Sequence, residues 1–397
     1  MLAEYLVFAA YLLLGPFTWA IYALGMNVLR FRLRLIERHA PDLPSPAPRA
    51  VILIPAKNEQ ERIADCVLSA LRQDYPDFGV IAIDDRSDDR TPQVLDELAA
   101  AHPRLKVIHI PHGSLPDGWT GKCNALQVAQ AHADGQWLLF VDSDVILRPQ
   151  ALRQAVAVAE SRRYGMVSLA LKLETPSLMT SLLMPLAAAA IMGMYRIVQV
   201  NQDRLRDVGF ANGQFILVRR DAYDRMGRHE AVRDRFTEDV ELGRIAKKLA
   251  LRPRFAWGMD LASVRMYDSL PSLLRGWARN FYGIGGGSPW RMLAVAAFIV
   301  FCCFSAYADA GWGVYRMIHP INMFEGWGWL GAAAVHLVVM TWALSRTYAW
   351  TGNPPRNALL FPVSGLLMLI LIAKALRLCM TGNVTWRGDA YSRPRAA

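Results

Sequence analysis

The stretch Gln136–Val141 reads QWLLFV and runs directly into Asp142, Ser143 and Asp144. A short continuous apolar run of this length is typical of a buried strand, which would place both aspartates at the strand's carboxyl end. Two carboxylates at alternate positions can hold a hard divalent cation, because such cations prefer oxygen ligands. A cation held there could bridge to a diphosphate and offset its charge. We therefore take Asp142 and Asp144 as candidate metal ligands.

The sequence before this stretch alternates between strand and helix patterns. Apolar strand runs are expected at 50–54, 80–83 and 105–110, and helical spacing is expected at 58–73, 91–101 and 122–133. This alternation predicts right-handed βαβ units and an α/β fold with a mostly parallel sheet. Ligands of such sheets bind beyond the carboxyl ends of the strands, and the polar motifs follow the first, second and fourth strands.

The first polar motif, IPAKNE (Ile54–Glu59), places Lys57, Asn58 and Glu59 in the loop after the first strand. The alternative to a ligand-binding role is a helix N-terminus that Asn58 caps. In the second motif, Asp84 and Asp85 end a strand as neighbours. They repel one another and need a partner to stay ionised. A uracil edge and a ribose would supply hydrogen-bond donors, and a solvated turn is the alternative.

Two further motifs place chemistry near helix starts. TEDVELG (Thr237–Gly243) puts Glu238 and Asp239 ahead of an expected helix at 240–249, where Asp239 could act as a general base. The alternative is a capping cluster, with Thr237 as N-cap and acids in the first turn. In LPDGWTGKCNAL, Lys122 could meet a diphosphate and Trp119 could stack on a sugar or base.

RGWARNF (Arg275–Phe281) places Arg275 and Arg279 four residues apart, on one face of an expected helix. The alternative interpretation is a basic amphipathic segment at a membrane surface. The net charge of +10 also has two interpretations. Basic flanks beside anionic lipid explain it without a polyanion, and no basic patch interleaved with aromatic residues indicates nucleic-acid binding.

Apolar runs at both ends predict a membrane protein. Residues 5–26 are uncharged and long enough to cross about 30 Å of hydrocarbon. No basic residue precedes them, so we do not expect a cleavable signal peptide. The arginines that follow predict a cytoplasmic catalytic domain at the inner membrane; they are Arg30, Arg32, Arg34 and Arg38.

The remaining apolar runs complete the expected domain organisation. Runs at 292–308, 327–344 and 358–379 predict two or three C-terminal transmembrane helices, and 178–200 predicts an interfacial helix. We expect an anchor at 1–28, a basic Pro-rich linker at 29–48, a catalytic domain at 49–290, membrane helices at 291–380 and a basic tail at 381–397.

In this order, PAKNE, DDRS, GWTGK, DSD and TEDVELG resemble glycosyltransferase family 2, over roughly residues 50 to 290. The GWTGK segment and the TWRGDAYS end (Thr385–Ser392) look most like its hopanoid-associated, carotenoid and ceramide glucosyltransferases. The resemblance implies a GT-A fold, a nucleotide-sugar donor, with UDP-sugar favoured, and Mg²⁺ or Mn²⁺. It implies that Asp84 and Asp85 bind the nucleoside, that Asp142 and Asp144 hold metal and diphosphate, and that Asp239 is the base.

Other candidate residues follow from the same motifs. Glu238 is a second candidate catalytic residue. The further candidates for nucleotide-sugar binding are Pro55, Lys57, Asn58, Glu59, Lys122, Arg275, Trp277 and Arg279. The sequence departs from the family at Arg86, where glycine is common. It also departs at the QxxRW motif of processive members: aligning Arg279 puts Gly276 at the glutamine position and Asn280 at the tryptophan position.

We expect inverting transfer of one sugar to a lipid hydroxyl at the inner membrane face. Three alternatives stay open. A polysaccharide synthase would need the processive motif, which is not intact. A phosphohydrolase with a DxD nucleophile would need that motif on the first strand, whereas three expected strands precede Asp142. A membrane protein that only binds a nucleotide is the third.

Overall fold

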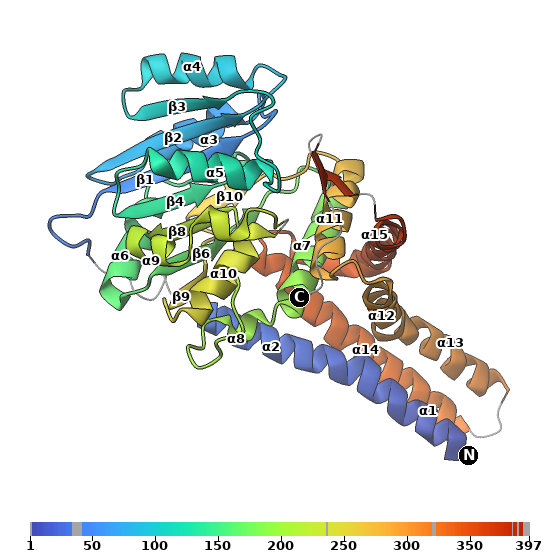
Figure 1. Cartoon of the computed structure of the whole chain (residues 1–397). Helices are drawn as coiled ribbons and strands as arrows, with labels where there is room; N and C mark the ends of the chain where they lie inside the picture. The colour runs from blue at the N-terminus through green and yellow to red at the C-terminus, as the bar shows by residue number, and fades with distance from the viewer. Residues whose placement is uncertain are drawn as a thin grey trace.

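The computed structural model describes residues 2–33, 42–235, 237–319, 323–382, 384–386 and 389–391. Figure 1 shows an α/β domain joined to a group of long helices that extend to one side, with the N-terminus at their far end. Arg34, Arg38 and most of the predicted basic tail lie outside the described residues.

A seven-stranded sheet organises the α/β domain, in the order β3-β2-β1-β4-β8-β6-β9. Its strands are β1 (Ala50–Ala56), β2 (Phe78–Asp85), β3 (Leu105–Ile110), β4 (Trp137–Val141), β6 (Met166–Ala170), β8 (Phe215–Arg219) and β9 (Pro253–Trp257). Only β8 runs antiparallel to its neighbours β4 and β6, while the other pairs are parallel. The predicted mostly parallel sheet is confirmed.

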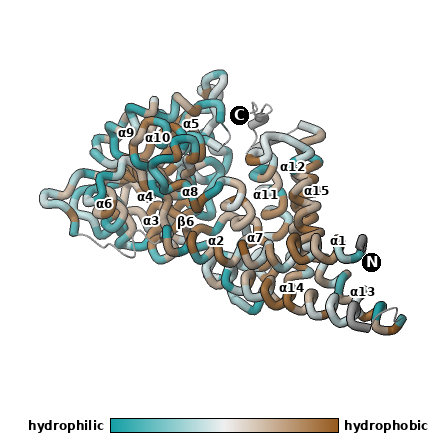
Figure 2. Tube along the Cα trace, turned by 90° about the horizontal axis from the view of Figure 1, so that it is seen from below, coloured by the Kyte–Doolittle hydropathy of each residue, from teal (hydrophilic) through white to brown (hydrophobic). Residues whose placement is uncertain are grey.

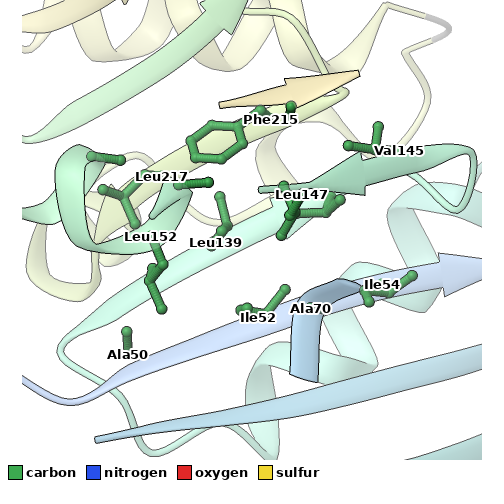
Figure 3. Packing of buried hydrophobic residues seen from close by; sticks show 14 of the residues in the cluster. Ala50, Ile52, Ile54, Ala70, Leu139, Val145, Leu147, Leu152, Phe215 and Leu217 are labelled. Atoms are coloured by element: carbon green, nitrogen blue, oxygen red, sulfur yellow. The ribbon is translucent and has the colours of Figure 1, made fainter. Parts of the chain in front are cut away.

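Helices cover both faces of this sheet because alternate residues of a strand point to opposite sides. Ile52 and Ile54 of β1 belong to one core cluster, with Leu152 of α6 (Ala151–Arg162) and residues of α3 (Ile63–Leu71). Figure 3 shows Ile52, Leu139 and Leu217 packing together on this face. Val51 and Leu53 join the other cluster, against α5 (Gly121–Ala131).

Smaller elements complete the structure. A second sheet contains β5 (Val145–Leu147), β10 (Ala262–Val264) and β7 (Lys172–Leu173), and a two-stranded sheet contains β11 (Val384–Trp386) and β12 (Asp389–Tyr391). The other helices are α4 (Thr91–Ala101), α7 (Leu178–Met194), α8 (Ile197–Val200), α9 (Arg220–Arg225), η2 (His229–Val232), α10 (Glu238–Lys248) and α11 (Leu270–Ile284). Among them, α7 and α11 share a core with the long apolar helices.

The structure corrects both capping alternatives. The helix expected from Asn58 begins at Ile63, so Asn58 does not cap it; its Oδ1 instead accepts a hydrogen bond from Asp88 N at 2.8 Å. Thr237 does precede α10, but its side chain makes no capping hydrogen bond. Neither polar side chain therefore serves as the N-cap that local spacing suggested.

Four helical runs are long and apolar enough to cross a membrane, as a membrane protein requires. The first joins α1 (Leu2–Leu12), η1 (Leu13–Phe17) and α2 (Thr18–Leu33). The others are α12 (Pro289–Ile299) with η3 (Val300–Phe304) and α13 (Ser305–Ile318), then α14 (Met323–Trp350), then η4 (Pro355–Leu360) with α15 (Phe361–Thr381). Figure 2 shows hydrophobic residues concentrated in α7, α14 and α15, and hydrophilic ones around α5, α9 and α10.

A buried polar contact ties these helices together. The Cys302 carbonyl, in the π-helical turn η3, accepts from Trp19 Nε1 at 2.6 Å and from His336 Nε2 at 3.0 Å. Backbone groups in hydrocarbon need such internal partners because no water replaces them. Helices α2, α12 and α14 are thereby held in one arrangement beside the domain.

Candidate active site

One cavity of about 420 Å³ lies where the carboxyl ends of the parallel strands meet the helices. Pro55 and Lys57 at the end of β1, Asp85 at the end of β2, and Asp142 and Asp144 after β4 all line it. Residues 55 to 144 along the chain thus converge on one space, as the topology of a parallel sheet dictates.

A lysine joins two of the candidate acids inside this cavity. Lys122 Nζ lies 2.6 Å from Asp142 Oδ1 and 2.9 Å from Glu238 Oε1. Lys122 stands in the first turn of α5, where Thr120 Oγ1 accepts from Cys123 N at 3.3 Å and fixes the helix start. Burial alone would lower the pKa of Lys122, but the carboxylates of Asp142 and Glu238 raise it well above its usual value.

Asp239 lies beside this network and is the acid most perturbed by it. Its Oδ2 accepts from Gly213 N at 2.8 Å, and its Oδ1 accepts from Val240 N at 2.8 Å. Burial, followed by the charge of Glu238, raises the pKa of Asp239 to about 7, although Lys122 and the two backbone donors act in the opposite direction. A carboxylate with such a pKa can accept a proton near neutral pH.

The adjacent acids at the end of β2 both have partners within the chain. Arg86 donates to Asp85 through Nε at 2.8 Å and Nη2 at 3.1 Å. Asp84 Oδ1 accepts from Ser87 N at 3.3 Å, and Asp84 Oδ2 lies 3.2 Å from His109 Nδ1. Arg86 adopts a φ of 58°, a conformation that explains why glycine suits this position. The departure from glycine therefore places a guanidinium directly on Asp85.

Several candidates lie behind the cavity wall rather than on it. Glu59 is buried, its Oε1 accepts from Ser143 Oγ at 3.0 Å, and its backbone N donates to Thr91 Oγ1 at 2.8 Å. Glu59 thus links the first motif to the DSD motif. Asn58 and Asp84 are likewise outside the set of described residues that line the cavity.

The tryptophan and arginine candidates also include both residues that line the cavity and residues that do not. Trp277 of α11 lines the cavity, whereas Arg275 is exposed and Arg279 and Trp119 are half-buried elsewhere among the described residues. Trp119 packs against the core under α5 instead of facing the cavity.

At Gly276, a Cβ would lie 2.0 Å from the Tyr267 hydroxyl. A glutamine therefore does not fit there unless Tyr267 moves. Tyr267 itself lines the cavity. It lies next to Gly276, the position at which processive members carry the glutamine side chain.

The DSD carboxylates fit a divalent cation. Asp142 and Asp144 both line the cavity, and both offer hard oxygen donors. The described residues contain no group of three histidine, cysteine or acidic side chains with metal-site geometry. Two carboxylates suffice for Mg²⁺, which is commonly bound by one or two carboxylates together with substrate phosphates and water.

Sequence patterns missed much of the cavity wall. The loop Asn212–Gln214 lines it just before β8, and Gly213 supplies the backbone donor to Asp239. Its signal is the small-residue segment ANGQ ahead of an apolar strand. Met26 of α2 and Trp350 of α14 also line the cavity, and no local sequence pattern predicts this.

Comparisons with known proteins find similarity to glycosyltransferases. Residues 51–227 match the family model described as Glycosyl transferase family 2. A beta-monoglucosyldiacylglycerol synthase of Synechocystis sp. is 30% identical over 159 residues, which is 37% of this chain and 32% of that protein. A 4,4'-diaponeurosporenoate glycosyltransferase of Staphylococcus haemolyticus is 23% identical over 261 residues, covering 63% of this chain and 66% of that protein. The chain thus spans from about a third to just under two thirds of these relatives.

Among solved structures, a mannosyltransferase of Pyrobaculum calidifontis in complex with GDP-Man and Mn²⁺ aligns with 91% of this chain and 97% of its own, at 18% identity and a TM-score of 0.45. The expected α/β architecture with apolar helices at both ends is confirmed by the structure itself. The DxD motif follows the fourth strand, which is central in the sheet, and this position does not meet the requirement of the phosphohydrolase hypothesis. Residues 51–227, which lie within the α/β domain, are thus similar to glycosyl transferase family 2.

Proposed function

We propose that this protein is an inverting glycosyltransferase that moves one sugar from a nucleoside diphosphate sugar to the hydroxyl of a lipid at the inner face of the membrane. The observation that carries the proposal is the position of Asp239, whose pKa is about 7, beside the Lys122–Asp142–Glu238 network in one cavity. The names of the two relatives refer to a glucosylated diacylglycerol and to a carotenoid carboxylate, so they favour a lipid acceptor, and the first of them favours a hydroxyl.

The proposed reaction is a single displacement. Asp239 takes the proton of the acceptor hydroxyl, whose oxygen attacks the anomeric carbon. A bond forms between that oxygen and the anomeric carbon, the bond from the carbon to the diphosphate breaks, and the nucleoside diphosphate leaves with the electron pair. The Lys122 ammonium faces the site where this negative charge develops, so it stabilises the transition state. Inversion follows because one displacement occurs without a covalent enzyme intermediate.

Asp142 and Asp144 would hold a divalent cation, which supplies Lewis-acid stabilisation of the diphosphate when it is bound. Also at the carboxyl ends of the strands, Lys57 and the Asp85–Arg86 pair would receive the nucleoside. A UDP-sugar is the donor that we favour from the DDRS resemblance. Transfer of a single sugar is favoured because Gly276 and Tyr267 replace the geometry of a processive glutamine.

The proposal is tested with the purified full-length chain in lipid nanodiscs. UDP-glucose, UDP-galactose, UDP-N-acetylglucosamine and GDP-mannose are each supplied with Mg²⁺ or Mn²⁺ and a total bacterial lipid extract, and products are identified by mass spectrometry. We expect one donor to add a single hexose-type mass to a lipid. Donor binding without any transfer, from any of these donors, would instead support a nucleotide-binding protein.

A further inference from the structure

The cavity continues past Asp239 into an apolar chamber, defined here by Met26, Ala188, Ala189, Met192, Trp277 and Trp350. These residues come from α2, α7, α11 and α14. Met26 and Trp350 belong to two of the runs long enough to cross a membrane, and α7 is a shorter apolar helix. The reaction site and the membrane helices therefore share one continuous space.

The charges of the cavity are confined to its other end. Lys122, Asp142 and Asp239 mark that end, while every described lining residue from α2, α7, α11 and α14 is uncharged. A ligand group in the chamber would have no ionic partner there, and burying an isolated charge is costly. A phosphate on the acceptor would also approach Glu238 and Asp239, which carry or share negative charge.

One residue of the chamber wall carries a buried polar donor without a partner among the described residues. Trp277 lines the cavity and is 5% exposed, and its indole Nε1 has no hydrogen-bond partner among the described residues. Buried indole N–H groups usually find a partner. An acceptor oxygen that reached this N–H would satisfy it.

The far wall of the chamber carries the features of a membrane interface. The guanidinium of Arg30 lies 5.7 Å from the ring centroid of Trp350, and that of Arg346 lies 5.3 Å from it. Tryptophan and basic side chains concentrate where hydrocarbon meets water. The cavity volume of about 420 Å³ is near the lower end of the range for one drug-sized ligand, so a donor leaves room only for the hydroxyl-bearing end of an acceptor.

We propose that the acceptor is an uncharged lipid alcohol that enters the apolar chamber from the bilayer between α2, α7 and α14, with its hydroxyl toward Asp239 and its tail left in the membrane. Trp277 Nε1 donates to an oxygen of this acceptor and positions it. The inference deepens the proposed function, because it excludes lipid phosphates and names the entrance.

Photolabelling tests the site without any turnover. The full-length protein in phosphatidylcholine nanodiscs is irradiated with a long-chain primary alcohol that carries a diazirine near its hydroxyl, or with the alkyl phosphate of the same chain. We expect the alcohol to label the chamber segments of α2, α7 and α14 at least about tenfold more than the phosphate does, as mass spectrometry of the peptides will show.

Variants make the labelling specific. Ala189→Trp fills the chamber and should reduce its labelling by about tenfold, whereas Leu24→Trp, on the exposed face of α2, should not. Ala188→Phe serves if Ala189→Trp does not fold. Trp277→Phe keeps an aromatic ring but removes the donor, so it should raise the acceptor KM more than it lowers kcat.

Equal labelling by both probes, or unchanged labelling in the filled variant, would overturn the inference. Nucleotide-sugar binding to the same samples is measured separately by calorimetry. A protein that binds no donor but shows the predicted labelling refutes the proposed function and leaves the lipid chamber standing. A protein that glycosylates a lipid phosphate refutes the chamber's selectivity alone.

Discussion

Replacing Asp239 with asparagine should remove activity and, at alkaline pH, make the protein more stable. The variant keeps the size of the side chain but cannot accept a proton. Loss of a general base costs roughly 10²–10⁴-fold in rate, so we expect transfer to fall by this factor while nucleotide-sugar binding persists. If Asp239 were only a helix-start residue, activity per folded molecule would stay unchanged.

The gain in stability follows from the pKa. Each tenfold change in an acid dissociation constant corresponds to about 1.4 kcal/mol. A pKa that rises from 3.8 to about 7 therefore represents at most about 4 kcal/mol of unfavourable ionisation in the folded state. Asparagine avoids this cost, but it satisfies only one of the Gly213 and Val240 backbone donors, which loses about 1–3 kcal/mol. The net gain above pH 7 should be about 1–3 kcal/mol.

The sign depends on pH. Because the folded pKa of Asp239 is raised, the wild type has the full contribution of the protonated group below about pH 4 and loses it as pH rises through about 7. The Asp239→Asn variant does not lose stability in this way, because asparagine does not ionise. The difference in apparent melting temperature, variant minus wild type, should therefore increase between about pH 4 and pH 7 and stay constant above pH 7.

Differential scanning fluorimetry in detergent across this pH range measures the difference, and a transfer assay on the same samples measures activity. A variant that is less stable than the wild type at every pH, by an amount that does not change with pH, would refute the assigned electrostatics. Near wild-type transfer by Asp239→Asn would refute the role of Asp239 as general base. Glu238 and Glu241 would then be the next candidates for that role.

Three further outcomes are expected. Lys122→Met removes a charge that lowers the pKa of Asp239, so the acidic limb of the kcat/KM profile should move to higher pH, while Lys122→Arg should move it less; an unmoved limb in Lys122→Met would contradict the coupling. Asp142→Asn and Asp144→Asn should each reduce transfer by at least about 10²-fold, and EDTA should inactivate the wild type until Mg²⁺ or Mn²⁺ is restored; full activity in EDTA argues against a metal. Gln93→Cys on the exposed face of α4 should react with a membrane-impermeant maleimide only after permeabilisation, since the five native cysteines are buried; labelling of intact cells would reverse the orientation.

Local sequence was enough to predict the strands and their polar ends. The expected strands at 50–54, 80–83 and 105–110 correspond to β1, β2 and β3, and Gln136–Val141 corresponds to β4. Their buried apolar runs have a strong period, and parallel topology then requires that Asp85 and Asp142 meet at one edge of the sheet. This prediction needs no knowledge of side-chain packing.

Helix starts were less predictable. Asn58 and Thr237 both stand where a capping residue is expected, yet Asn58 bonds to Asp88 and Thr237 makes no capping bond. Capping preferences are worth only about 0.5–2 kcal/mol, so contacts between loops that are distant in sequence can override them.

Sequence alone determined the α/β class, the apolar helices and the order of the motifs, because each depends on the periodicity of neighbouring residues. Only the tertiary structure decided which candidates face the ligand cavity. Lys122 touches Asp142 and Glu238 across 20 and 116 positions of the chain, and Met26 and Trp350 reach the same cavity from opposite ends of the sequence. The pKa of Asp239 belongs to the same category, because burial and neighbouring charge are properties of the folded arrangement and not of the TEDVELG motif.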